Sequence, residues 1–313
     1  MIDIAVIGGG PAGLTAGLYG ARSGFSCSLF ERELAGGQTL KTDMIANYPG
    51  FDEGIDGFTL SMRMRRQAED LGLNFINEDV IEFAFEKDVK LIRTSSGEYE
   101  AKTVIIATGA QPRKLGLPNE NALTGKGVSY CAVCDAAFFT NANVAVVGGG
   151  DTAITDALHL ARFAAHVTVV HRRNELRANP LLQAKAYADS KIEFIYNSVV
   201  SEIMGENSVA GIVITDVNTG KQRHADVSGL FVAIGNVPRT ELVRDKLKLT
   251  PGGYVLTDSR MRSSVDGVYA VGDVRDTPLR QVVTAAADGA VAASDAADRL
   301  SISNAGASSG KEA

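Results

Sequence analysis

Short apolar runs alternate with glycine-rich turns along most of this 313-residue chain. Residues 2–7 and 26–30 have the length and composition of buried strands, and residues 14–23 between them have the spacing of a helix. A strand, a helix and a second strand in this order are typical of a parallel sheet covered by helices. The pattern next predicts a helix at residues 61–71. Strands are predicted at residues 74–76, 80–85, 89–94 and 103–110, and those at 80–85 and 89–94 suggest a hairpin.

The same plan occurs a second time. Residues 143–147 predict a strand, 154–164 a helix and 167–170 the next strand. Residues 229–235 mirror residues 104–109 as a strand that ends in glycine. The sequence therefore predicts an α/β protein with two units of similar architecture, and the chain is long enough for each unit to bury its own core.

A glycine-rich loop lies between the first strand and the first helix. Gly8, Gly10 and Gly13 form the pattern G-x-G-x-x-G, and Glu31 ends the second strand. We expect Gly8 to make the tight turn, Gly10 to let a pyrophosphate approach, and Gly13 to let the helix pack on the strand. The N–H groups at the helix start would bind phosphates, and Glu31 would accept the hydroxyls of an adenosine ribose. This setting predicts a dinucleotide site.

A second loop of this kind opens the second unit. It reads Gly148-Gly149-Gly150-Asp151-Thr152-Ala153, and the strand after its helix ends in His171-Arg172-Arg173, with Arg177 beyond. No carboxylate stands where a ribose 2′-hydroxyl would be bound, and several cations do. Cations suit a 2′-phosphate, so we expect NADP(H) rather than NAD(H). The alternative is a solvated basic turn.

Polar positions in the loops of the first unit suit an extended cofactor. Gln38 and Asn47, in a loop-rich region, can donate to a ring system or a phosphate, unless they serve in turns only. Thr108-Gly109 end a buried strand and permit close approach by a nucleotide.

The last part of the chain also contains residues that suit a bound cofactor. A strand at 268–271 leads to Asp273, which can accept a ribityl or ribose hydroxyl. A helix is predicted from 281 to about 300, and its positive end, near Arg280-Gln281-Val282, would face the N1–O2 locus of a reduced flavin if the cofactor is one. Residues 301–313 are Ser-, Ala- and Gly-rich and are expected to form a disordered tail.

Composition narrows the function classes. A net charge of −6 without blocks of like charge argues against nucleic-acid or anionic-membrane binding. No apolar run reaches the ~18 residues that span a bilayer, and a strand-like run begins at once without a basic segment before it. We therefore expect a cytoplasmic protein. Cys27, inside an apolar run, is expected to be a buried core residue.

Cys131 and Cys134 form a C-x-x-C pair, followed directly by Asp135. In a reducing cytosol such a pair is more often catalytic than structural, and its geometry favours a thiolate. A dithiol between two dinucleotide loops suggests electron transfer from one nucleotide to another and then to sulfur. The alternatives are a structural disulfide or half of a zinc site, although three cysteines are too few for a four-thiolate site, and no metal is expected.

The order of these motifs resembles the low-molecular-weight, bacterial-type thioredoxin reductases, which are class II pyridine nucleotide-disulfide oxidoreductases. The resemblance extends to about residue 300. Its motifs are residues 8–13, Gly36-Gly37-Gln38, Tyr130-Cys131-Ala132-Val133-Cys134-Asp135, His171-Arg172-Arg173 with Arg177, and Gly272-Asp273-Val274. Val133, Ala136 and Leu176 depart from the residues usual in the family without removing a reacting group, and Glu175 adds a negative charge near the expected 2′-phosphate.

The resemblance implies a homodimeric flavoprotein with two Rossmann-like (three-layer ββα) domains. Residues 1–112 and 242–313 would form the FAD domain. Residues 113–241 would form the inserted NADPH domain, which carries the redox-active pair.

The resemblance also implies an activity. Hydride would pass from NADPH to FAD, the reduced flavin would reduce the Cys131–Cys134 disulfide, and the dithiol would reduce oxidised thioredoxin. Cys134 would lie nearer the flavin, Cys131 would attack the partner disulfide, and Asp135 would protonate the departing thiolate. One dithiol cannot easily reach both flavin and partner, so the family's rotation of the NADPH domain is expected, with hinges at 111–117 and 235–239.

The expected cofactor residues form two groups. Those for FAD are Gly8, Gly10, Pro11, Ala12, Gly13, Glu31, Gly37, Gln38, Asn47, Val80, Thr108, Gly109, Gly272, Asp273, Arg280, Gln281 and Val282. Those for NADPH are Gly148, Gly150, Asp151, Thr152, Ala153, His171, Arg172, Arg173, Arg177 and Gly235.

Other functions remain open. A related flavin disulfide reductase, such as a peroxiredoxin reductase module, would carry an extra thioredoxin-like region before the first glycine loop. A dithiol oxidase would keep the cysteines but need not keep the arginines, and a ferredoxin–NADP reductase of similar fold would lack the cysteines. A non-catalytic nucleotide sensor would use the C-x-x-C as a redox switch and would not oxidise NADPH continuously.

Overall fold

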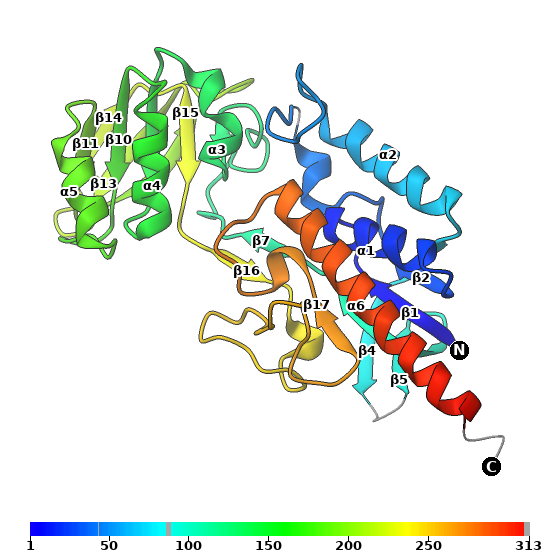
Figure 1. Ribbon diagram of the computed structural model, residues 1–313. Coiled ribbons are helices and arrows are strands. Elements are labelled where there is room, and N and C mark those ends of the chain that lie inside the picture. The colour runs from blue at the N-terminus through cyan, green and yellow to red at the C-terminus, as the bar shows by residue number, and fades with distance from the viewer. Residues whose placement is uncertain (43, 86–88, 310–313) are drawn as a thin grey trace. The chain divides into compact units, whose positions relative to one another are not determined.

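The computed structural model describes residues 1–42, 44–85 and 89–309, and the chain divides into two compact units (Figure 1). The first consists of Met1–Gln111 and Val237–Ala313, and the second, Pro112–Asn236, is inserted into it. Residues 237–241, expected in the inserted domain, belong to the first unit because Arg239 N donates to Gly109 O at 2.9 Å and Thr240 Oγ1 to Gly253 O at 2.9 Å. The two connecting strands, β7 (Ala110–Pro112) and β16 (Asn236–Pro238), pair with each other.

A seven-stranded sheet forms the centre of the first unit. Its order is β3-β2-β1-β6-β5-β4, with β17 also paired to β6. These strands are β1 (Ile2–Ile7), β2 (Cys27–Phe30), β3 (Asn74–Ile76), β4 (Val80–Phe85), β5 (Lys90–Thr94), β6 (Glu98–Ile106) and β17 (Val268–Ala270). The pairs of β1, β2, β3, β6 and β17 are parallel, and β4-β5-β6 are antiparallel. The expected hairpin at 80–94 is thereby confirmed.

Side chains of β1 alternate between two apolar layers. Ile4 and Val6 pack with α1 (Pro11–Arg22) and α6 (Val282–Ser309), whereas Ala5 and Ile7 pack with β4, β5 and the segment around Val255. This alternation is the consequence of the two-residue period of a strand. The remaining helical elements of the unit are η1 (Gly37–Lys41), α2 (Gly57–Asp70), η3 (Glu241–Val243) and η4 (Gly272–Val274).

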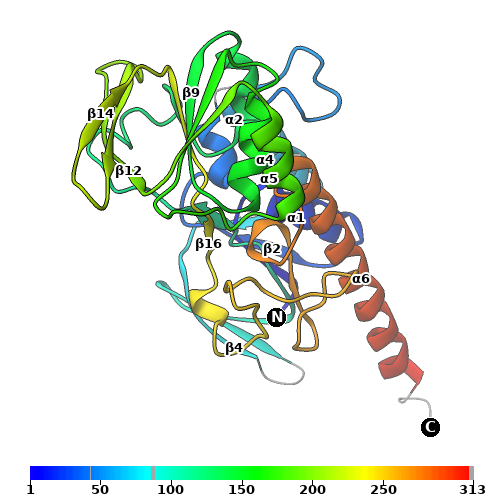
Figure 2. The same ribbon diagram turned by 90° about the vertical axis from the view of Figure 1, so that its left-hand side faces the viewer.

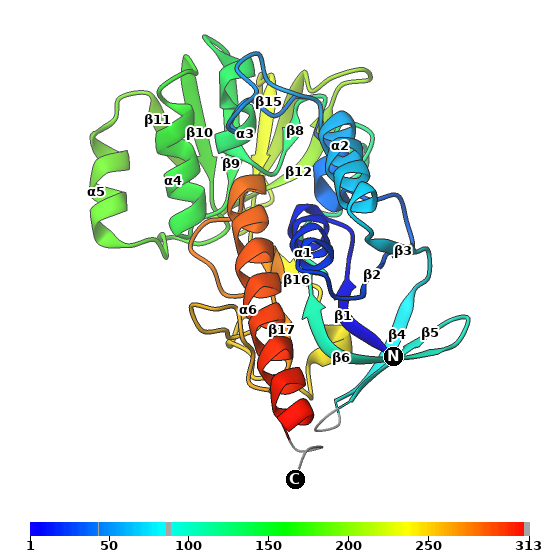
Figure 3. The same cartoon turned by 45° about the vertical axis from the view of Figure 1, so that its right-hand side comes forward.

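Helices α1 and α6 lie side by side over the sheet (Figure 3). Their contact is made by small residues, including Ala12, Ala16, Ala292 and Ala296. A Cβ on Gly289 would lie 2.2 Å from Ala12 O, so the two helices approach too closely for any side chain at this position. This contact fixes the N-terminal part of α1, which carries the first glycine loop.

A buried carboxylate holds α6 at its middle. Asp295, 5% exposed, accepts hydrogen bonds from Arg262 at 2.6 and 2.7 Å, from Arg260 at 3.0 Å and from the Tyr269 hydroxyl at 2.8 Å. Burial alone would raise the pKa of Asp295, but these donors outweigh it and lower the pKa to about 2. The carboxylate therefore remains ionised and links α6 to β17.

The second unit is built on a five-stranded parallel sheet in the order β11-β10-β9-β15-β8. Its strands are β8 (Val128–Ser129), β9 (Asn143–Val147), β10 (His166–Val170), β11 (Ile192–Ile195) and β15 (Gly229–Val232). A separate antiparallel sheet consists of β12 (Ser198–Met204), β13 (Gly211–Asp216) and β14 (Gln222–Ala225). The helical elements are α3 (Ala132–Asp135), η2 (Ala136–Phe139), α4 (Asp151–Leu160) and α5 (Pro180–Ala188).

The second unit also has three layers. Val144 and Val146 of β9 pack with α4, while Ala145 and Val147 pack with β12 and β13. Figure 2 shows α4 and α5 on one side of β9 and the β12–β14 sheet on the other. The predicted α/β class with two Rossmann-type units, each a helix layer, a parallel sheet and a β layer, is confirmed.

Helix ends differ from the prediction where capping decides them. Helix α2 begins at Gly57 rather than at residue 61, because Asp56 caps it by accepting from Thr59 N at 2.8 Å. The expectation of a disordered tail from residue 301 is wrong up to Ser309. There α6 continues without a proline, and Ser301 and Ser303 donate to carbonyls four residues earlier. Residues 310–313 lie outside the described residues.

Candidate active site and nucleotide-binding loops

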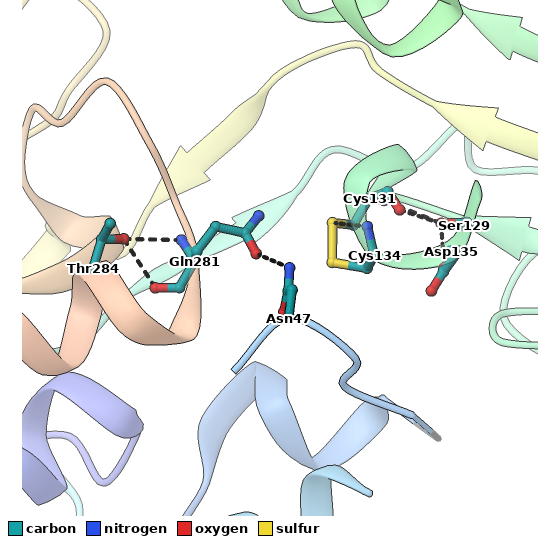
Figure 4. The surroundings of a disulfide bond; sticks show 7 residues. All are labelled: Asn47, Ser129, Cys131, Cys134, Asp135, Gln281 and Thr284. Atoms are coloured by element: carbon teal, nitrogen blue, oxygen red, sulfur yellow. Dashed lines mark hydrogen bonds between the residues drawn. A yellow bond between two sulfur atoms is a disulfide. The ribbon is translucent and has the colours of Figure 1, made fainter. Parts of the chain in front are cut away.

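Cys131 and Cys134 form a disulfide with a Cα–Cα distance of 5.3 Å (Figure 4). Cys131 occupies the N-cap position of α3, and its Sγ accepts a hydrogen bond from Cys134 N at 3.2 Å. Both cysteines are half-buried. Because they lie only three positions apart in the chain, the bond closes a single turn and its opening releases little backbone freedom.

Asp135 is held beside the disulfide by a buried serine. Ser129 Oγ, at the end of β8, donates to Asp135 Oδ2 at 2.6 Å and accepts from Cys131 N at 3.1 Å (Figure 4). Ser129 is 5% exposed, whereas Asp135 is half-buried. The structure thus brings together the expected residues of the dithiol site and adds Ser129, which no motif of the sequence indicates.

Tyr130, next to Cys131, is anchored by a buried glutamate. Its hydroxyl donates to Glu120 Oε1 at 2.8 Å, and Glu120 also accepts from Leu115 N and Gly116 N, each at 2.8 Å. Glu120 is 1% exposed. Burial and this acceptor both raise the pKa of Tyr130. Glu120 therefore joins the residue before Cys131 to the segment after β7, a role that only the folded structure reveals.

The first glycine loop has the geometry expected for a dinucleotide site. Gly8 has a φ of +108°, and a Cβ there would lie 2.5 Å from Ala107 O. A Cβ on Gly13 would lie 1.9 Å from Gly8 O, so α1 packs directly on the loop. Gly10 caps α1, which begins at Pro11 and Ala12, and no atom lies within 4 Å of its Cβ position. The space above the helix N-terminus is therefore open.

Glu31 is also bound to this loop by a hydrogen bond. Its Oε2 accepts from Gly9 N at 2.8 Å and its Oε1 from Glu33 N at 3.0 Å. Each carboxylate oxygen has a second lone pair, so the side chain keeps the capacity to accept hydroxyl groups. The sequence predicted the acceptor role but not the bond to the loop.

A second tight turn follows the loop of the first unit. Gly36 N donates to Gly9 O at 2.7 Å, and Gly36 and Gly37 have φ values of +133° and +57°. A Cβ on Gly37 would lie 3.4 Å from Gly10 Cα, so the turn runs directly along the glycine loop. Gln38 is exposed at the start of η1.

Asn47 and Gln281, far apart in the sequence, lie together. Asn47 Nδ2 donates to Gln281 Oε1 at 3.0 Å, and Gln281 N donates to Thr284 Oγ1 at 3.1 Å (Figure 4). Val282, the first residue of α6, packs on the cluster of Ile45, Ile55 and Leu60. The expected polar positions of two distant segments are thus brought to the start of one helix.

Near this helix start, Gly272 and Asp273 form η4. Gly272 has a φ of +69°, and its Cβ position lies 2.9 Å from Ala12 Cβ of α1. Burial raises the pKa of Asp273, with Arg280 opposing the rise and Asp288 adding to it. Arg280 stacks on Tyr254 at 4.3 Å, and its buried Nε has no hydrogen-bond partner among the described residues. Such an unsatisfied buried donor suits an acceptor of a bound ligand.

Three further predicted FAD residues have structural roles that the sequence did not indicate. Val80 is a buried core residue of β4. Thr108 Oγ1 donates to Arg239 O at 2.6 Å, and Gly109 O accepts from Arg239 N. The Thr108-Gly109 pair therefore binds the returning chain, while no atom lies within 4 Å of the Gly109 Cβ position.

The second glycine loop repeats the first. Gly148 has a φ of +155°, and a Cβ there would lie 2.5 Å from Ala233 O and 2.6 Å from Ala153 Cβ. Gly150 caps α4, and no atom lies within 4 Å of its Cβ position. Asp151 Oδ1 accepts from Asn179 N at 2.6 Å, while Thr152 is exposed. Gly235, with a φ of +101°, also has open space at its Cβ position.

The four residues of the expected basic motif separate into two kinds. Arg172, Arg173 and Arg177 are exposed, and no ion pair joins them to other described residues. Arg177 N donates to Gly149 O at 2.7 Å, which places this arginine beside the loop.

His171 is different. It is 5% exposed, and a Cβ on Gly149 would lie 2.3 Å from its ring. Burial lowers the pKa of His171, and the charges of Arg177 and Arg173 lower it further. Burial therefore disfavours the charged form that the sequence led us to expect of His171, and its ring packs directly against Gly149 of the glycine loop.

The third cysteine, Cys27, lies in the hydrophobic core of the first unit. Cys27 is free and buried, as expected, and burial raises the pKa of its thiol to about 12. Within residues 1–42, 44–85 and 89–309, no cluster of His, Cys, Asp and Glu suits a metal ion. None of the helices described there is both long and apolar enough to cross a membrane.

A sequence model of the pyridine nucleotide-disulphide oxidoreductases matches residues 2–289. The chain belongs to this family. It is 45% identical over 300 residues to the thioredoxin reductase of Peptoclostridium acidaminophilum, covering 94% of this chain and 95% of that protein. It is 43% identical over 292 residues to the thioredoxin reductase of Bacillus subtilis, covering 93% and 92%.

Solved structures agree with the sequence relatives. The thioredoxin reductase of Streptococcus pyogenes superposes with a TM-score of 0.91 at 45% identity, covering 96% of this chain and 98% of that one. That of Giardia duodenalis gives 0.90 at 37% identity, covering 96% and 99%. The resemblance to thioredoxin reductases inferred from the motifs is confirmed, and the protein is an oxidoreductase.

Proposed function

We propose that this protein is an NADPH-dependent thioredoxin-disulfide reductase that carries FAD in its first unit. The observation that carries the proposal is the half-buried Cys131–Cys134 disulfide with Asp135 held beside it, in the same unit as a nucleotide loop flanked by exposed arginines. The relatives named thioredoxin reductase support the substrate class.

The first unit fits FAD. Gly8, Gly10 and Gly13 leave the space above the start of α1 open for a pyrophosphate, and Glu31 offers acceptors for a ribose. Asp273 and the unsatisfied Arg280 Nε lie near the start of α6, where Asn47 and Gln281 also meet. Bound FAD would supply two-electron exchange between a nicotinamide and a disulfide.

The second unit fits NADPH. The open space at Gly150 lies at the N-terminus of α4, which suits a pyrophosphate. Arg172, Arg173 and Arg177 suit the 2′-phosphate, because arginine binds phosphate through paired charge-assisted hydrogen bonds. The exposed Glu175 weakens this preference slightly by its negative charge.

The residues of the C-x-x-C turn perform the exchange with thioredoxin. The Cys131 thiolate attacks a sulfur of the partner disulfide, and the other partner sulfur leaves as a thiolate. The Cys134 thiolate then attacks Cys131 Sγ, which restores the disulfide and releases the second partner thiolate. Reduction of the Cys131–Cys134 bond produces two thiolates, and Asp135 gives a proton to one of them.

The biological setting is part of the proposal. The protein works in the cytoplasm as a homodimer, like the bacterial-type enzymes that its motifs resemble. Turnover uses rotation of the second unit about the two connecting segments, residues 111–117, which overlap β7, and residues 235–239, which contain β16. Rapid turnover after the units are cross-linked rigidly would contradict the rotation.

Steady-state oxidation of NADPH with oxidised thioredoxin tests the function. We expect fast, thioredoxin-dependent oxidation by the yellow purified protein, and loss of this activity in Cys131→Ser. Cys27→Ala is the matched control, because it removes a buried cysteine outside the proposed site and should keep the activity. Oxygen uptake at the same rate without thioredoxin would indicate a dithiol oxidase, and no sustained oxidation with any disulfide would indicate a sensor.

A further inference from the structure

Ser129 connects the two ends of the redox turn. It lies at the end of β8, two residues before Cys131 and six before Asp135, and it is almost completely buried. Its Oγ is 3.1 Å from Cys131 N, 2.6 Å from Asp135 Oδ2 and 3.4 Å from Cys131 O (Figure 4). One hydroxyl therefore touches the backbone of one reactive cysteine and the carboxylate of the proposed acid.

The direction of these hydrogen bonds is fixed by chemistry. The N–H of Cys131 can only donate, so Ser129 Oγ is the acceptor in that bond. A serine hydroxyl has one proton to donate, and the carboxylate at 2.6 Å competes for it with the carbonyl at 3.4 Å. The shorter contact, to a charged acceptor, is the stronger. A continuous path of hydrogen bonds thus leads from the Cys131 N–H through the Ser129 hydroxyl to the Asp135 carboxylate.

We propose that Ser129 is a positioning residue for the thiol–disulfide chemistry, which orients Asp135 and sets the pH at which it gives up its proton. The proposal rests on the function assigned to the dithiol above. The side-chain hydrogen bonds of Ser129 go to the Asp135 carboxylate and the Cys131 backbone, and it acts through these groups. Donation to Oδ2 favours the ionised carboxylate, so removal of the hydroxyl makes Asp135 retain its proton to higher pH.

The rigid surroundings allow the serine to keep this role. Ser129 pairs with Phe231 in the parallel sheet, and Tyr130, which follows it, is held by Glu120. Asp135 and Cys131, in contrast, are half-buried at the reacting surface. A polar group fixed in the sheet thus orients groups on a short turn, whose cysteines change oxidation state in every cycle.

The test compares Ser129→Ala with Ser129→Thr in the flavin-loaded, oxidised protein. The first readout is the carbon-13 NMR titration of the Asp135 carboxyl, assigned by loss of its signal in Asp135→Asn. We expect the midpoint to rise by about one pH unit in Ser129→Ala, given the strength of a hydrogen bond to a charged acceptor, and to stay near the wild-type value in Ser129→Thr. Ser129→Gly removes the same hydroxyl and serves if the alanine variant does not fold.

The second readout is the pH profile of kcat with oxidised thioredoxin. We expect Ser129→Ala to shift this profile in the same direction, and to have no further effect on it when added to Asp135→Asn. A midpoint unchanged by loss of the hydroxyl would overturn the proposal, as would an equal shift in Ser129→Thr. If wild type failed to reduce thioredoxin, the proposed function would fall, while the titration would still decide whether Ser129 controls Asp135.

Discussion

The three exposed arginines of the second unit give the sharpest functional prediction. Arg172, Arg173 and Arg177 make no ion pair with other described residues, so replacing one should hardly affect folding. If they bind the 2′-phosphate, each replacement removes a charge-assisted hydrogen bond worth about 1.5–3 kcal/mol. Arg173→Ala should therefore lower kcat/KM for NADPH by ~10- to 150-fold. The value for NADH, which lacks that phosphate, should not change.

The assay is steady-state oxidation of both nucleotides with oxidised thioredoxin by the same preparation. Arg223→Ala is the matched control, because Arg223 is exposed on β14 of the same unit and pairs only loosely with Glu193 at 3.7 Å. It changes the net charge equally and should leave both nucleotides unaffected. An equal loss for NADPH and NADH in Arg173→Ala would refute the 2′-phosphate assignment, and so would no loss at all.

Two predictions concern the first unit. The pKa of Asp295, at about 2, is lowered from its ordinary value of 3.8, so its network stabilises the fold above pH ~4 and loses this effect as pH falls towards 2. Asp295→Asn should lower the free energy of unfolding in urea by about 2 kcal/mol at neutral pH, and this difference from wild type should shrink below pH ~4. A difference independent of pH would exclude the ionised Asp295 carboxylate as its cause. In Gly289→Ala the new Cβ would lie 2.2 Å from Ala12 O, so α6 must move away from α1. We expect the free energy of unfolding to fall by about 1–3 kcal/mol and FAD retention to weaken. The control Gly97→Ala meets open space and should change neither, and unchanged flavin retention in Gly289→Ala would show that this contact does not support the loop.

Local patterns were enough to predict most of the fold. The strand–loop–helix order around Gly8 and Gly148 depends on residues that are neighbours in the sequence, and so does the hairpin of β4 and β5. The buried state of Cys27 also follows from the apolar run that contains it. In each case the period of apolar residues decides the structure.

Tertiary contacts decided what the sequence missed. His171 stands beside two arginines in the sequence, yet its ring packs against Gly149 and burial lowers its pKa. Ser129 and Glu120 act through partners that the folded turn brings to them, and neither belongs to a recognisable motif. The end of α6 is a local exception: the composition after residue 300 suggests disorder, whereas the chain stays helical and Ser301 and Ser303 donate to carbonyls of the same helix.

The most direct test of the central claim follows the sulfur atoms themselves. The flavin-loaded protein is mixed with NADPH without oxygen, quenched with an alkylating reagent and analysed by mass spectrometry. We predict that Cys131 and Cys134 become alkylated only after NADPH is added and are protected again once oxidised thioredoxin follows, while the buried Cys27 stays unmodified throughout. Reduction of thioredoxin while Cys131 and Cys134 remain disulfide-bonded would contradict the account.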